Sequence, residues 1–174
     1  VVESRILDNE KQKELLANAF KSEAKGDWIS ALESWNLLLR GGSKFVREWA
    51  QLRRVSVLKE LGEDNVAELF LRGMYLYAES AFLRQKAFGK LEERYRKNDA
   101  PDKLFTLYAT EAIRRPSPEG LRRLAESLFE QGQFEMAFFL GLTLMDEYQP
   151  VTIMIRGAYR VGWWKHFSAL VARL

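Results

Sequence analysis

Few side chains in this chain of 174 residues have the types and spacing that acid–base, nucleophilic or metal chemistry needs. There is no cysteine and a single histidine, His166, which leaves only a mixed histidine–carboxylate arrangement open for a metal. Two carboxylate pairs, Glu92-Glu93 and Asp146-Glu147, are neighbours on expected helices. The two side chains of each pair therefore point in different directions, and we expect them to be solvated charges. No clustered glycine loop for phosphate is present. The residues therefore predict no catalytic site, no metal and no cofactor, and we expect the protein not to be an enzyme.

Arginines are the side chains whose spacing does suggest a ligand. Arg53 and Arg123 each precede a turn glycine by nine residues, and both fall in segments that we expect to be the first helix of a pair. Arg122 lies one step earlier, and Arg156 and Arg160 extend the series. Guanidinium groups bind carboxylates through two parallel hydrogen bonds. The series predicts a positive strip for acidic groups of a partner, and the alternative is a solvated face with ordinary Arg/Glu pairing.

Five tryptophans could in principle stack on bases or sugars. Trp28 and Trp35 fall at expected core positions, so we expect them to pack inside. Trp49 and the Trp163-Trp164 pair are less constrained, because neighbours on a helix are about 100° apart and one of the pair must leave the core stripe. The candidate partner-binding residues are therefore Arg53, Trp49, Arg122, Arg123, Arg156 and Arg160.

Turn signals recur along the chain and set its architecture. They lie at Gly26, Gly62, Asn98-Asp99, Gly132 and Gly162, at intervals of 36, 36, 34 and 30 residues. Between them, apolar residues repeat every three or four positions, which is typical of amphipathic helices. No alternating strand pattern bounded by hairpin turns occurs. We therefore predict an all-α chain of about five antiparallel helix pairs.

Local signals place several helix ends. Ser43 and Ser117 are suited to cap helices, and Pro101 and Pro118 are suited to the first turn. The segment 65–97 lacks a proline and a strong cap, so one long helix is an alternative to two there. We place a break near Glu79 to Ala81.

The repeat pattern resembles the tetratricopeptide family, whose units are helix pairs of about 34 residues. The clearest match is in residues 121–150, at Leu121, Leu124, Ala125, Leu128, Gly132, Phe134, Ala137 and Pro150. A second copy lies at Ala19, Gly26, Trp28, Ala31 and Trp35. The alanines at 31, 67 and 137 are expected where the two helices of a pair cross closely. The resemblance covers about residues 10–174 and implies a right-handed α-solenoid whose first helices line a concave groove for a partner segment.

Composition restricts the class of partner that we expect. The chain has 27 lysine and arginine residues and 24 aspartate and glutamate residues, which gives a net charge of +3. Nucleic-acid binders usually carry a larger excess of positive charge. The apolar run from Met136 to Met145 is too short to cross a bilayer of about 30 Å. A cysteine-free chain fits the cytoplasm and the periplasm equally well.

Residues 1–9 are expected to be an N-terminal flank and residues 10–174 one repeat domain, part of a longer chain because the sequence begins at Val1. The last helix, from Trp164 to Leu174, carries an apolar face that we expect to be covered by further repeats or by self-association. The predicted function is a non-enzymatic scaffold that binds a protein or peptide segment, with acidic groups, in the solenoid groove. Binding of RNA or another polyanion, and a helical domain of a larger enzyme, are the alternatives.

Overall fold

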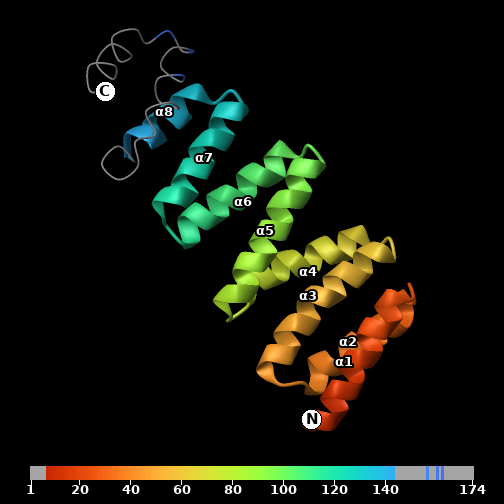
Figure 1. Ribbon diagram of the computed structural model, residues 1–174. Helices are drawn as coiled ribbons and strands as arrows, with labels where there is room; N and C mark the ends of the chain where they lie inside the picture. The colour runs from red at the N-terminus through yellow and green to blue at the C-terminus, as the bar shows by residue number, and fades with distance from the viewer. Residues whose placement is uncertain (1–6, 144–155, 157–159, 161, 163–174) are drawn as a thin grey trace. The chain divides into compact units, whose positions relative to one another are not determined.

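The computed structural model describes residues 7–143 together with residues 156, 160 and 162, and this part of the chain is helical without any strand (Figure 1). Helices of 10 to 17 residues follow one another through short connections. Their bounds are α1 Asn9–Ala24, α2 Trp28–Gly41, α3 Lys44–Glu60, α4 Asp64–Tyr77, α5 Ala81–Lys97, α6 Pro101–Arg114, α7 Pro118–Glu130 and α8 Phe134–Thr143. The all-α prediction is confirmed.

The break expected near Glu79 to Ala81 is also confirmed. Helix α4 ends at Tyr77 and α5 begins at Ala81, so the segment 65–97 contains two helices. Ala78 leaves the helix in an extended conformation, and the Ser80 hydroxyl accepts a hydrogen bond from the Leu83 N–H at 3.4 Å. Ser80 therefore supplies the weak cap that opens α5.

The chain divides into two compact units, one up to Leu91 and the other from Glu92 onward. The first holds α1 to α4 and most of α5, and the second holds the end of α5 and α6 to α8. The predicted fifth helix pair, His166 and the Trp163-Trp164 pair lie outside the described residues, apart from Arg156, Arg160 and Gly162. A single domain over residues 10–174 stays a prediction.

The predicted turns share one backbone geometry. Gly26, Gly62 and Gly132 have φ between 72° and 78°, and Asp99 takes their place between α5 and α6 with φ 47°. The residue after each turn donates its N–H to the carbonyl five residues back, as Asp27 does to Ser22 at 2.9 Å. This is a Schellman motif, which satisfies the last carbonyls of a helix and needs a left-handed residue. Gly162 has φ 73° and fits the same series.

Each turn also begins the next helix. Asp27 caps α2 by accepting the Ser30 N–H at 3.2 Å, and Asp8 caps α1 through the Lys11 N–H at 2.7 Å. Ser117 caps α7 through the Gly120 N–H at 3.1 Å, with Pro118 in the first turn as predicted. Ser43 stands at the N-cap of α3 without a side-chain cap bond, and its own N–H donates to Gln12 Oε1 at 3.0 Å. The side chain of Gln12 thus ties α1 to the start of α3.

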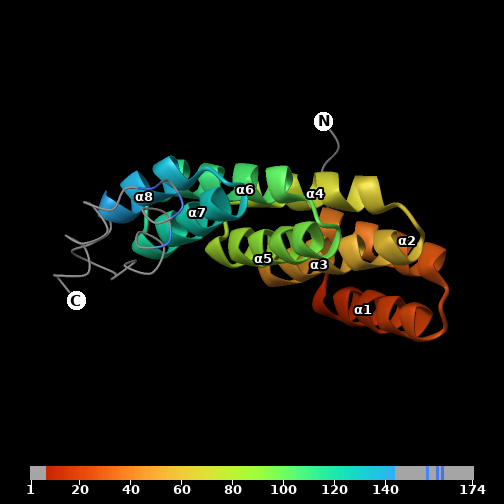
Figure 2. The same ribbon diagram turned by 90° about the horizontal axis from the view of Figure 1, so that it is seen from above.

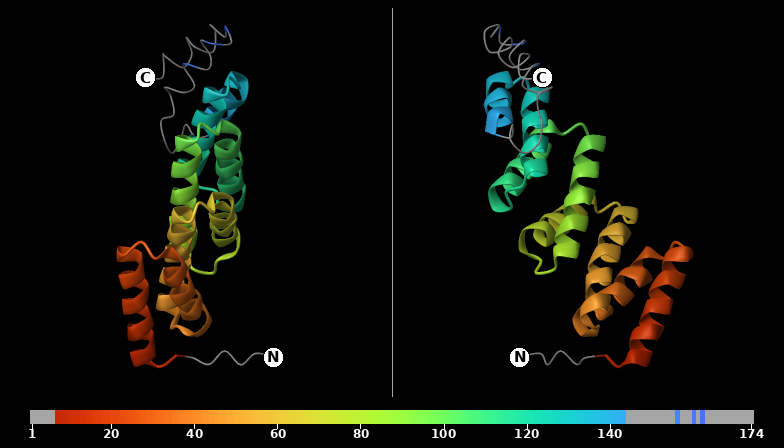
Figure 3. Two further views of the ribbon diagram at one scale, coloured as in Figure 1. Left: turned by 90° about the vertical axis from the view of Figure 1, so that its right-hand side faces the viewer. Right: turned by 60° about the vertical axis from the view of Figure 1, so that its left-hand side comes forward.

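In the first unit α1, α2 and α3 pack in succession and alternate in direction (Figure 3). Their core is built around Trp35, which is fully buried, with Trp28 partly buried beside it. Both tryptophans therefore pack, as the sequence predicts. Ala31 and Ala67 are also fully buried, since a larger side chain at these positions would push the helices apart.

In the second unit α7 packs against both α6 and α8. Figure 2 shows α6 and α8 in one layer and α7 in the other. Ala125 of α7 and Ala137 of α8 are fully buried. The rings of Phe129 and Phe134 pack edge to face across the turn, with their centres 5.1 Å apart. Small residues at close crossings and aromatics around them thus build both units.

The turn geometry predicts opposite effects for two glycine substitutions. A Cβ added at Gly26 or at Gly89 meets no atom within 4 Å, but only Gly26 has a positive φ. Gly26→Ala should lower the free energy of unfolding by about 1–2 kcal/mol through left-handed strain. Gly89→Ala, inside α5, should raise it by about 0.5–1 kcal/mol. Urea unfolding followed by circular dichroism measures both, and shifts of the same sign would contradict the assignment.

Candidate functional site

Arg53, the first predicted partner-binding arginine, is paired with a carboxylate of the chain itself, and its side chain is 35% exposed. It lies on α3 and reaches Glu23 of α1, where its Nε donates to Oε1 at 3.2 Å and its Nη2 binds Oε2. Trp35 of α2 donates its Nε1–H to the same Glu23 Oε1 at 2.7 Å. The Glu23 side chain is only 8% exposed. One buried carboxylate therefore joins three successive helices.

Arg123 takes part in a second arrangement of this kind, in the other unit. Its Nη1 lies 3.6 Å from Oε2 of Glu92, which is on α5. Tyr108 of α6 donates its hydroxyl to Glu92 Oε1 at 2.6 Å, and Arg96 Nη2 donates to the Tyr108 oxygen at 2.8 Å. As in the first unit, a carboxylate links three helices: Glu92 on α5 binds the aromatic donor Tyr108 on α6 and the arginine Arg123 on α7.

The two arrangements, which we call the carboxylate ties, occupy matching places in their repeats. Trp35 and Tyr108 each follow a left-handed turn residue, Gly26 or Asp99, by nine positions. Arg53 and Arg123 each precede the next turn glycine by nine. The equal spacing of Arg53 and Arg123 in the sequence therefore corresponds to equivalent contacts in the structure. The carboxylate that each of them binds belongs to the chain itself.

Arg122 and the remaining candidates lie on the surface. Arg122 donates to both carboxylate oxygens of Glu119 at 2.9 Å and also pairs with Glu126. Hydrogen bonding from Arg122, helped by Arg123, lowers the pKa of the Glu119 carboxyl to about 2. Ordinary Arg/Glu pairing thus describes Arg122 well. Arg156 and Arg160 are exposed. Partner binding by these arginines stays a prediction.

Trp49, the aromatic candidate, lies in an apolar depression on the first helices of the first unit. Trp49 and Phe45 are one turn apart on α3 and are 41% and 69% exposed, and Phe20 of α1 is 46% exposed. With Leu16, Val46 and the edge of Trp35 they line a volume of about 270 Å³. We call this depression the aromatic notch. The guanidinium of Arg53 lies beside it, 5.7 Å from the Phe20 ring centre.

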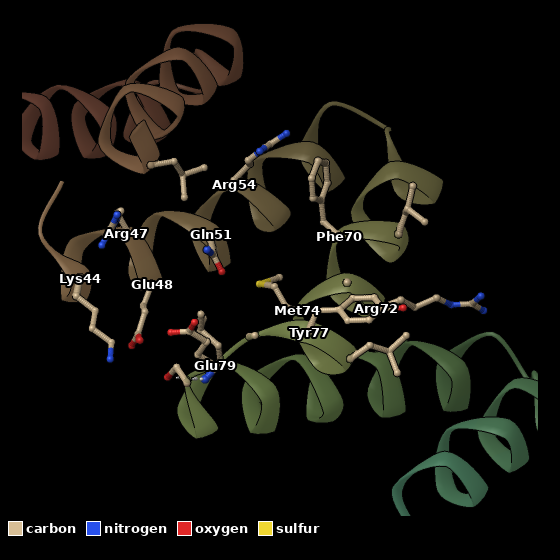
Figure 4. Close-up of a pocket in the computed structure, with 17 residues that line it drawn as sticks. Lys44, Arg47, Glu48, Gln51, Arg54, Phe70, Arg72, Met74, Tyr77 and Glu79 are labelled. Atoms are coloured by element: carbon tan, nitrogen blue, oxygen red, sulfur yellow. Dashed lines mark hydrogen bonds between the residues drawn. The ribbon is translucent and has the colours of Figure 1, made fainter. Parts of the chain in front are cut away.

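A larger pocket, which was not predicted from the sequence, opens on another side of α3. Its volume is about 1010 Å³, and it lies between α3 and α4, closed at one end by the start of α5. In Figure 4, Gln51 of α3 and Met74 of α4 point toward one another across it. We call this space the α3–α4 pocket. Exposed apolar residues on α4, such as Tyr77, could have revealed it.

Among the described residues, no group of three or more histidine, cysteine, aspartate and glutamate side chains is placed to hold a metal ion. No helix in this part of the chain has the length and apolar character to cross a membrane.

Comparison with known proteins identifies the class of fold. A tetratricopeptide repeat protein from Parabacteroides merdae ATCC 43184, solved at 2.39 Å resolution, superposes with a TM-score of 0.52 and 14% sequence identity over 93% of this chain. The match covers 64% of that protein, so this chain spans less than two thirds of its length. No family model and no curated protein matches the sequence.

The chain is thus a helical-repeat protein of the α-solenoid class, with helices that pack in consecutive pairs. More narrowly, its fold is tetratricopeptide-like, as the repeat pattern predicts.

The second carboxylate tie predicts a pH dependence of stability. Burial and the hydrogen bond to Glu92 raise the pKa of Tyr108 to about 12. Because this pKa lies above the value of about 10 in an unfolded chain, the neutral phenol stabilises the folded state below pH 10, and that contribution is lost as the pH rises toward 12. Tyr108→Phe should cost about 1–2 kcal/mol at pH 7. The free energy of unfolding of the Tyr108→Phe variant should also fall less steeply than that of the wild type between pH 10 and 12.

Urea unfolding at pH 7, 10 and 11.5 measures this difference. Tyr77→Phe is the matched control, because Tyr77 is 79% exposed and lies outside the tie. Equal slopes for the wild type and Tyr108→Phe would contradict the role given to the phenol.

Proposed function

We propose that this chain is a non-enzymatic protein-interaction scaffold that binds a partner segment at the aromatic notch. The proposal rests on one observation above all. Phe20, Phe45 and Trp49 expose large apolar surfaces next to one another on α1 and α3. Contiguous exposed apolar patches mark interaction sites, and tryptophan is the residue type most enriched among residues that dominate binding energy.

The position of the notch agrees with the groove predicted from the sequence. Helices α1 and α3 are the first helices of their pairs, the elements expected to line it. A partner would insert an apolar side chain between Phe45 and Trp49, and the nearby Arg53 would contribute through its stem and its position beside Phe20. In this role Arg53 keeps its ion pair with Glu23.

Protein binding is favoured over binding of RNA or another polyanion by the state of the arginines. Arg53, Arg122 and Arg123 each pair with a carboxylate of the chain, so their charge is largely compensated. Phosphate binding draws its affinity from uncompensated cations that release counterions. An apolar notch beside compensated arginines suits a protein segment better.

Affinity capture with quantitative mass spectrometry tests this function. The bait is the full chain beside a Phe45→Ser/Trp49→Ala variant, with nuclease-treated extract from the source cells. The matched control is Ile29→Ser, which removes an equally exposed apolar residue of α2 outside the notch. We expect at least one protein to be retained by the wild type and the control and reduced about tenfold or more with the notch variant, a change of about 1.4 kcal/mol.

Equal recovery with all three baits would contradict binding at the notch. A second pair of measurements addresses the alternative: single-stranded RNA is titrated with the wild type at 50 and 200 mM salt. RNA binding that weakens steeply with salt would favour the polyanion-binding function instead.

A further inference from the structure

The α3–α4 pocket has two walls of different character. On α4, Phe70, Gly73 and Tyr77 follow one another at intervals of three and four residues, which places them on one apolar face of the helix. Tyr77 is 79% exposed, and Met74 and Leu83 lie buried at the base. A Cβ at Gly73 would meet no atom within 4 Å, so the middle of this wall is open.

The opposite wall, on α3, is basic and polar. Lys44, Arg47, Gln51 and Arg54 repeat at intervals of three, four and three residues and so form one stripe along the pocket. Glu48 is the acidic residue of this wall, and Glu79 lines the pocket from the connection between α4 and α5. Within the described part of the chain, Lys44 and Arg47 have no carboxylate at ion-pair distance. The α3 wall therefore carries three cations against one carboxylate.

Arg54 is the member of this stripe that most lacks a counter-charge. Its guanidinium lies 4.0 Å from the Phe70 ring centre, and its Nε is buried without a hydrogen-bond acceptor. Burial lowers the pKa of Arg54, because no neighbouring carboxylate offsets the loss of water. A cation held against an aromatic ring in partly dry surroundings interacts strongly with an anion brought beside it.

We propose that the α3–α4 pocket is a second docking site, distinct from the aromatic notch, and that it takes an amphipathic partner helix with an acidic flank. The apolar stripe of that helix packs over Phe70, Gly73 and Tyr77. Its carboxylates face Lys44, Arg47 and Arg54. A helix laid between two helices buries apolar anchors spaced three and four residues apart, the same spacing that the α4 wall presents.

The two stripes make the chemistry of the partner specific. An uncharged apolar helix would cover Lys44 and Arg47 without compensating them, and a basic helix would be repelled by the α3 wall. Gln51, between the cations, can donate to a carboxylate or accept from a neutral side chain. The acidic flank is therefore the property that separates the true partner from other amphipathic helices.

A display library tests the proposal on the full chain. The library holds 18-residue helical peptides with a fixed leucine stripe, and the positions on both flanks are randomised among glutamate, lysine, glutamine and serine. Selection uses the wild-type chain alone, and the Tyr77→Ser variant is kept for the binding measurements. Selected peptides and their glutamine-for-glutamate versions are then titrated by fluorescence anisotropy at 50 mM salt. Tyr77 is exposed, so its variant is expected to fold.

We expect glutamate to dominate one flank, and we expect its replacement by glutamine to weaken binding about tenfold or more. Arg47→Glu should weaken the glutamate peptides similarly and restore binding when their flank glutamates are changed to lysine. Lys59→Glu on the same helix, outside the pocket, is the matched control. Selection without acidic enrichment, or equal binding of the glutamine versions, would overturn the acidic partner. Binding unaffected by Tyr77→Ser would overturn the site, and binding unaffected by Trp49→Ala separates this result from the aromatic notch.

Discussion

The carboxylate of Glu23 is the interaction on which the first unit most depends. It receives an N–H from Trp35 of α2 and the guanidinium of Arg53 from α3, while its own backbone is in α1. An isolated helix pair cannot bury both of its apolar faces, so each pair needs the next one. The tie fixes how that next helix lies along the first two. Removing one member would leave a charged or polar group buried and unpaired, which is far more costly than losing a surface ion pair.

The tie also decides which surfaces are left for other molecules. Arg53 and Arg123 pair with carboxylates of their own chain, so neither of these two guanidinium groups is an unpaired cation. Helix α3 has two further stripes on different faces. Phe45 and Trp49 line the aromatic notch, while Lys44, Arg47 and Arg54 line the α3–α4 pocket. One helix thus supplies an internal contact and two chemically different external surfaces.

The amino-acid sequence predicts the fold well because the fold is built from local signals. A left-handed glycine ends a helix wherever it stands, and Asn98-Asp99 could be recognised as its substitute because aspartate tolerates that conformation. The break before α5 was harder to place, since Ser80 caps it only weakly. Buried alanines at 31, 67 and 137 follow from the same repeat.

The sites could be predicted only in part, because they depend on contacts between distant segments. The spacing of Arg53 and Arg123 was visible, but Glu23 and Glu92 stand at different distances from their turns, so no periodic signal connects each pair. Trp49 was singled out, while Phe45 and Phe20, its neighbours in the notch, come from two helices. The α3–α4 pocket depends on how far α3 and α4 separate, which side-chain patterns on either helix do not specify.

A double-mutant cycle on Glu23 and Arg53 tests the central claim most directly. The free energies of unfolding of the wild type, Glu23→Gln, Arg53→Gln and the double variant are measured in urea at 50 and 500 mM salt. A structural tie predicts a coupling free energy of about 1–2 kcal/mol that persists at the higher salt, because the carboxylate is buried. Single substitutions whose effects add to within about 0.3 kcal/mol would show that the two residues act independently, and would contradict the account.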